Sequence, residues 1–154
     1  MKILFLLSLN LSKQGPSVHV LSSLIAHLAD IGHQVHIVQQ CFDDNAPFLP
    51  DALCNNDAIT CEGIHVPMLE KSNFIRRYIV QKRYAMAAGR RIKAHCDADI
   101  IYVHSCNTLS IFAWFAKWYA KKASLVVNVQ DIFPENAAMV DMIKRTGLLY
   151  RIMA

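Results

Sequence analysis

The sequence lacks the motifs typical of several common classes of protein. Its five cysteines are an odd number with irregular spacing, and no two form a Cys-x-x-Cys pair; they are Cys41, Cys54, Cys61, Cys96 and Cys106. This pattern is a poor disulfide framework and gives no cysteine zinc site, so we expect reduced thiols in a cytoplasmic protein. No motif for binding RNA or DNA is present, and a formal net charge of +4 does not indicate a nucleic-acid partner. We expect no metal and no cofactor.

Long hydrophobic runs are also missing. The most apolar later stretch, residues 109–120, is too short to span a bilayer and carries Lys117. The first seven residues have one positive charge and then an apolar run, as a signal peptide does, but no small-x-small cleavage site follows them. A buried parallel strand gives the same string, and we favour the strand. Peripheral attachment to the inner face of the membrane stays open as an alternative.

What the sequence does contain is a regular alternation of apolar strings and helical periods. With 154 residues, of which 54% are hydrophobic, the chain can form one domain with a core, spanning residues 1–154. Apolar strings predict strands at 3–9, 35–38, 63–67, 100–104 and 125–129. Helical periodicity lies between them, beginning at Ser17, Phe74 and Thr108, and a last helix is expected over 135–154. Strands separated by helices imply an α/β class with a doubly wound, Rossmann-like parallel sheet and the first strand central.

Ligands of such sheets bind at the carboxyl ends of the strands, which directs attention to two loops. The first contains Gly15 and ends at Ser17, a plausible helix N-cap, where free backbone N–H groups favour an anion such as a phosphate. An ordinary turn also favours glycine, proline and serine. The second loop starts with His104, which can donate to a hydroxyl or phosphate or transfer a proton, and continues with Ser105 and Asn107. The alternative for His104 is a structural role as a helix cap.

The pentapeptide Asp131-Ile132-Phe133-Pro134-Glu135 follows the last predicted strand. Asp131 ends a buried strand, where an unpaired carboxylate is costly, so we expect it to face a partner, water or a ligand. Glu135 lies in the first turn of the last predicted helix, where a carboxylate also has a purely structural advantage. Both residues are therefore candidates for the same site as His104.

The helix predicted from Phe74 carries an unbalanced basic stripe. Arg76, Arg83 and Arg90 repeat at seven-residue spacing, and no acidic residue falls between Glu70 and Asp97. Such a stripe fits an anionic membrane surface or a lipid phosphate, while the simpler alternative is a solvated basic face.

The order of these elements resembles glycosyltransferase family 4, the retaining enzymes of the GT-B fold. The features that carry the resemblance are the glycine-containing loop after the first strand, Asp99-Ile100-Ile101-Tyr102-Val103-His104, and above all the pentapeptide at 131–135. This last motif is similar to that of enzymes building bacterial surface polysaccharides, including fucosamine-type transferases. The resemblance implies that the chain is the N-terminal, acceptor-binding half of an enzyme that moves a sugar from a nucleotide-sugar donor to a lipid-linked or saccharide acceptor. It implies that His104 contacts the transferred sugar and that Gly15 lines the cleft.

Two departures from that family limit what this chain is expected to do. The loop has one glycine where relatives often have two, and the C-terminal domain that grips the nucleotide-sugar is absent. We therefore expect the chain alone to be inactive, with a non-catalytic membrane- or partner-binding module of the same fold as the alternative. A nicotinamide-dependent oxidoreductase is disfavoured because Gly15 stands alone in the first loop and the second strand ends in Gln39-Gln40 rather than an acid.

Overall fold

The computed structural model describes residues 1–42, 49–68, 74–104, 109–129, 138–139, 144–147 and 150–151. Strands and helices alternate along these ranges, as the hydrophobic periodicity predicts. In chain order they are β1 (Lys2–Leu7), α1 (Pro16–Asp30), β2 (Gln34–Cys41), α2 (Asp51–Cys54), β3 (Ile59–His65), α3 (Phe74–Ala94), β4 (Ile100–His104), α4 (Leu109–Tyr119) and β5 (Ser124–Asn128).

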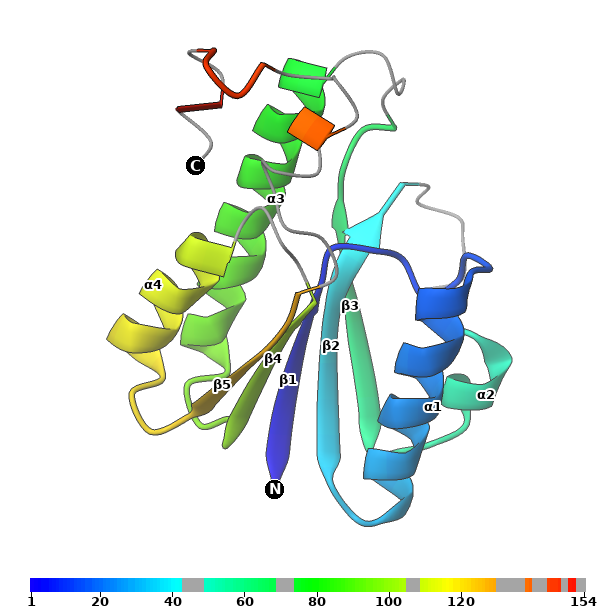
Figure 1. Cartoon of the computed structure of the whole chain (residues 1–154). Coiled ribbons are helices and arrows are strands. Elements are labelled where there is room, and N and C mark those ends of the chain that lie inside the picture. The colour runs from blue at the N-terminus through cyan, green and yellow to red at the C-terminus, as the bar shows by residue number, and fades with distance from the viewer. Residues whose placement is uncertain are drawn as a thin grey trace.

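The five strands form one parallel sheet in the order β3-β2-β1-β4-β5 (Figure 1). The chain runs outward from β1 through β2 to β3, and then returns to place β4 on the other side of β1. The strand order therefore reverses between β1 and β4, which is the topological switch point of a doubly wound sheet. The predicted Rossmann-like α/β class and the central position of β1 are confirmed.

Helices cover both faces of the sheet, with α1 on one face and α3 and α4 on the other (Figure 1). Side chains of β1 alternate between these two layers, so Ile3, Phe5 and Leu7 pack beneath α1 while Leu4 and Leu6 pack beneath α3 and α4. Helices α3 and α4 pack closely against each other. A Cβ atom at Gly89 of α3 would lie 2.3 Å from the Phe115 ring of α4, so only glycine allows this approach of the two helices.

Several local predictions differ from the structure. β3 begins at Ile59 rather than at residue 63, and the short helix α2 lies in a segment where no helix or strand is predicted. In α1, Val20 is 68% exposed, while Leu21, Ile25 and Ala29 are buried against the sheet. The helix predicted over 135–154 falls mostly outside the described residues. None of the described helices has both the length and the apolar character needed to cross a bilayer.

Candidate functional site

At the switch point, Ser8, the residue after β1, is hydrogen-bonded to His104, the last residue of β4. Both groups of Ser8 donate to the carbonyl oxygen of His104, the backbone N–H over 3.2 Å and the hydroxyl over 2.9 Å. The loop that leaves β1 is thereby tied to the last residue of β4. This contact lies at the carboxyl end of the sheet, where the sequence predicts a site.

Buried amide side chains shape the loop between β1 and α1. The Asn10 side-chain oxygen accepts hydrogen bonds from the Ser12 N–H (2.8 Å) and the Ser12 hydroxyl (2.6 Å). The Gln39 side-chain oxygen accepts from the backbone N–H of Leu11 over 2.8 Å, and Asn10 and Gln39 are both buried. These hydrogen bonds satisfy the backbone N–H groups of Leu11 and Ser12 in the loop that precedes Gly15.

Gly15 is the residue just before α1, and its backbone is extended, with φ 167°. No heavy atom lies within 4 Å of where a Cβ would sit, so neither conformation nor space requires glycine here. Ser17, predicted as the N-cap, is instead the second residue of the helix, because Pro16 occupies the first position. No side chain caps this helix and its first turn has no acidic residue. Pro16 has no N–H, and the N–H groups of Val18 and His19 both donate to the Gly15 carbonyl oxygen over 3.1 Å. The predicted anion site stays a prediction.

His104 is the one candidate of the second loop that the structure places. It ends β4 beside Leu7 of β1 and Asn128 of β5, and only 7% of its surface is exposed. Tyr102 packs into the layer beneath α1, and strand alternation puts His104 on the same face. Its Nδ1 atom is buried without a hydrogen-bond partner among the described residues. Burial lowers the pKa of the imidazole, which favours the neutral ring.

The structure therefore brings Gly15, Ser17 and His104 to the same end of the sheet. The other candidates predicted for this site, Ser105, Asn107, Asp131 and Glu135, lie outside the described residues.

A buried tyrosine that the sequence reading did not single out also belongs to this end. The Tyr84 hydroxyl of α3 donates to the carbonyl oxygens of Leu7 and Val38, the second over 3.3 Å. These acceptors lie near the carboxyl ends of β1 and β2, so the side chain fastens α3 to both strands. Burial raises the pKa of the phenol, and it is neutral at any physiological pH. Only the fold reveals this role, since the periodicity of α3 shows burial of a position but no hydrogen-bond partner.

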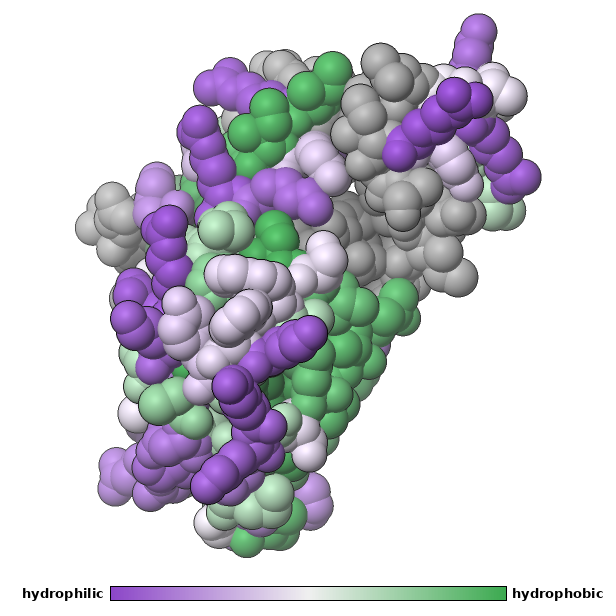
Figure 2. Space-filling model, turned by 90° about the vertical axis from the view of Figure 1, so that its left-hand side faces the viewer, coloured by the Kyte–Doolittle hydropathy of each residue, from purple (hydrophilic) through white to green (hydrophobic). Residues whose placement is uncertain are grey.

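The predicted basic stripe lies on the surface of α3. Arg76, Arg83 and Arg90 are all exposed, as expected for the side opposite the core. A depression of about 460 Å³ runs along the helix, lined by Tyr78, Ile79, Lys82, Arg83, Met86 and Arg90. In the view of the α4 side, long hydrophilic side chains surround paler and hydrophobic ones (Figure 2). The exposed face of α3 and α4 is therefore mixed in character, with cations standing beside apolar groups.

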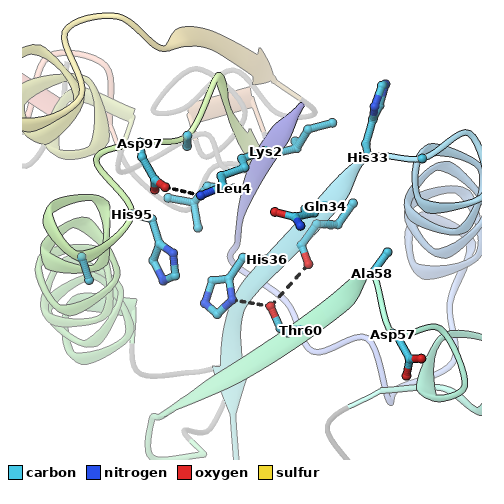
Figure 3. A pocket seen from close by; sticks show the side chains of 15 residues that line it. Lys2, Leu4, His33, Gln34, His36, Asp57, Ala58, Thr60, His95 and Asp97 are labelled. Carbon is cyan, nitrogen blue, oxygen red and sulfur yellow. Dashed lines mark hydrogen bonds and ion pairs between the residues drawn. The ribbon is translucent and has the colours of Figure 1, made fainter.

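A second cluster, not anticipated from the sequence, lies at the opposite end of the sheet. A depression of about 790 Å³ opens beside the amino ends of β1 and β2 (Figure 3). His36 and His95 stack there, with ring centroids 3.9 Å apart, and Glu62 and Arg91 form an ion pair of 3.0 Å beside them. Burial, and after it the neighbouring His95, lowers the pKa of His36. Sequence reasoning missed this cluster because its members come from strands and a helix that are far apart along the chain.

Comparison with known proteins gives a likeness of fold alone. No family model and no curated protein matches the chain. Two solved structures of the C-terminal domain of the PF1911 hydrogenase from Pyrococcus furiosus are similar to it. One has a TM-score of 0.60 at 15% identity and covers 83% of this chain and 90% of that one. The other has a TM-score of 0.59 at 14% identity and covers 82% of this chain and 90% of that one.

These findings contradict the resemblance to glycosyltransferase family 4. Glycine and acidic residues in the loops after the strands are found in many doubly wound sheets, so the motifs quoted for it do not identify a family. The solved structures that match show the same α/β fold in a hydrogenase domain, and identities of 14–15% carry nothing beyond the fold.

Proposed function

We propose that this chain is a peripheral module that docks on anionic membranes through the exposed face of α3 and α4. Sugar transfer is not tested by the structure or by the comparisons, and the family resemblance that motivated it is contradicted. The proposal takes up the alternative weighed from the sequence, a binding module that keeps the Rossmann-like fold. The observation that carries it is the combination of an excess of positive charge with exposed aromatic and aliphatic side chains on one pair of packed helices.

Charge supports the proposal first. Helix α3 contains seven arginine or lysine residues and α4 contains Lys117, while neither helix contains an acidic residue. Each Lys or Arg close to an anionic lipid surface contributes about 1 kcal/mol. Arg76, Arg83 and Arg90 would together contribute about 3 kcal/mol, or roughly a hundredfold in the binding constant. That is sufficient for transient docking at low salt and too weak for permanent anchoring.

Exposed apolar side chains on the same helices support it further. On α3, Ile75, Ile79 and Met86 are exposed, and on α4 Trp114 and Trp118 are 52% and 59% exposed. The two tryptophans are one helical turn apart, with ring centroids separated by 6.3 Å. Tryptophan prefers the headgroup level of a bilayer, where one part of the ring is wet and the rest is apolar. Aromatic rings beside arginine and lysine are the composition expected of an interfacial surface rather than of a merely solvated one.

The two tryptophans also provide the test, because they are the only ones in the sequence and both lie on the proposed docking face. We expect their emission to shift to shorter wavelength when vesicles of phosphatidylserine and phosphatidylcholine in equal amounts are added. Vesicles of phosphatidylcholine alone should give no shift. Salt at about 1 M, where the Debye length falls to about 3 Å, should reverse the effect.

A triple charge reversal should abolish both the emission shift and co-sedimentation with the anionic vesicles. Its substitutions are Arg76→Glu, Arg83→Glu and Arg90→Glu. The matched control is Lys13→Glu, which reverses an exposed lysine in the loop before α1 and should leave binding nearly unchanged. Equal sedimentation of the triple variant and the wild type would show that the basic stripe is only a solvated face.

A further inference from the structure

Three side chains with metal-ligating atoms meet at the amino end of the sheet, outside the face just described. His36 comes from β2, Glu62 from β3, and His95 directly follows α3. One ligand atom of each lies within 4.8 Å of the other two. All three side chains are half-buried, and His36 and His95 line the depression at this end (Figure 3). The cluster is therefore held by the framework of the fold and is still reachable from solvent.

The hydrogen bonds of His36 decide which of its nitrogens is available. The Thr60 hydroxyl lies 3.5 Å from the carbonyl oxygen of Val35, to which it donates, and 2.7 Å from Nδ1 of His36. The Thr60 hydroxyl therefore engages Nδ1, and the roles of donor and acceptor follow the tautomer of the ring. In the tautomer with the proton on Nδ1, the lone pair of the neutral ring is on Nε2. That atom is buried and has no hydrogen-bond partner among the described residues.

Nε2 of His36 faces a carboxylate oxygen. The Oε1 atom of Glu62 lies 3.7 Å away and is buried. Arg91 Nε stands 3.0 Å from Oε1 and balances the carboxylate charge from one side. An imidazole lone pair opposite a carboxylate oxygen is unfavourable unless a proton or a metal cation lies between them. The gap is thus suited to a cation.

We propose that His36, Glu62 and His95 form a binding site for a divalent transition-metal ion of the zinc class. Two imidazoles and one carboxylate are a known zinc ligand set, which leaves a fourth position to water. Bond lengths of about 2.0–2.1 Å place two ligand atoms of a tetrahedral zinc ion about 3.3 Å apart, close to the gap between His36 and Glu62. Thr60 orients the His36 ring from behind, as outer partners of ligating histidines do.

Binding requires one adjustment within the site. The rings of His36 and His95 are stacked with an interplanar angle of 27°, so their lone pairs run side by side instead of converging. His95 must rotate out of the stack to direct a nitrogen at the ion. Its position at the end of α3, half-buried at the margin of the depression, gives it room to do so (Figure 3).

Calorimetric titration of the whole chain with Zn²⁺ tests the proposal, with visible absorption of bound Co²⁺ as an independent signature of the ligand set. We expect one ion per chain, and loss of that binding in His36→Gln and in Glu62→Gln. Thr60→Val, which removes only the orienting hydroxyl, should weaken binding by about 10- to 100-fold.

Two controls separate this site from incidental metal binding. His33→Gln removes a histidine that lines the same depression but is outside the cluster, and Cys96→Ser removes the exposed thiol next to His95. Both should bind Zn²⁺ as the wild type does, and circular dichroism should show every variant folded. The site does not exist if the wild type fails to bind, if folded His36→Gln binds as well as the wild type, or if Cys96→Ser abolishes binding.

Discussion

The two ends of the parallel sheet accommodate their polar side chains in opposite ways. At the carboxyl end, Asn10, Gln39 and Tyr84 are buried and hydrogen-bonded to backbone or side-chain groups of neighbouring elements. At the amino end, His36 and Glu62 are half-buried, Nε2 of His36 lies 3.7 Å from Oε1 of Glu62, and the only charge beside that oxygen among the described residues is Arg91, with Nε 3.0 Å away.

This difference indicates different uses of the two ends. A buried polar group destabilises the fold unless it is hydrogen-bonded, so the satisfied groups at the carboxyl end are fixed parts of the architecture. The groups at the amino end keep unused acceptor capacity next to solvent, which is what a ligand site requires. His104 is the exception at the carboxyl end, because its Nδ1 is buried without a partner among the described residues.

The largest effect on stability is expected from removing the Tyr84 hydroxyl at the carboxyl end of the sheet. Tyr84→Phe keeps the ring and removes the hydroxyl, which leaves the carbonyl oxygens of Leu7 and Val38 without their donor. We expect the free energy of unfolding to fall by about 1–3 kcal/mol, the cost of a buried unsatisfied polar group. Urea denaturation measures this directly. Tyr119→Phe, at an exposed tyrosine of α4, should change stability by less than about 0.5 kcal/mol. Equal effects of the two variants would show that the Tyr84 bonds do not hold the end together.

A smaller effect on stability is expected when a change of pH protonates His104. Burial lowers its folded-state pKa below the unfolded value, so the unfolded chain binds the proton more readily. The contribution of His104 to stability is therefore fully present above the unfolded pKa of about 6.5, and it is lost as pH falls through that value toward the folded pKa.

Denaturation of the wild type and of His104→Leu between about pH 7.5 and pH 5 tests this linkage on both sides of the ordinary histidine pKa of about 6.5. We expect the wild type to lose more stability on acidification than the variant. A difference between the two proteins that is constant across this range would mean that His104 is not buried as a neutral ring.

The smallest effect on stability is expected at the amino end. Without added metal, His36→Gln should alter the free energy of unfolding by less than about 1 kcal/mol, because it removes one bond to Thr60 and the stacking of two half-buried rings. With Zn²⁺ present, the wild type should gain stability that the variant does not, since a ligand that binds only the folded state stabilises it. A large loss in metal-free His36→Gln would instead make His36 a structural group like Tyr84.

Sequence by itself determined the class of the fold. Apolar strings that alternate with helical periods permit only a parallel sheet with covering helices, and the exposed side of α3 follows from the seven-residue spacing of Arg76, Arg83 and Arg90. It also brought Gly15, Ser17 and His104 to one end, because every loop that follows a parallel strand emerges there. The family assignment failed because short motifs at strand ends are shared by many unrelated proteins of this fold.

Tertiary structure alone decided which polar groups are satisfied. Whether an acceptor such as Nε2 of His36 meets a donor depends on strand register and on where α3 ends, and residues separated by dozens of positions set both. Periodicity identifies the buried face of α3, but it cannot show that the Tyr84 hydroxyl reaches Leu7 and Val38. Hydrogen bonds are short and directional, so a pattern that fixes the layers of a protein still leaves its individual polar contacts undetermined.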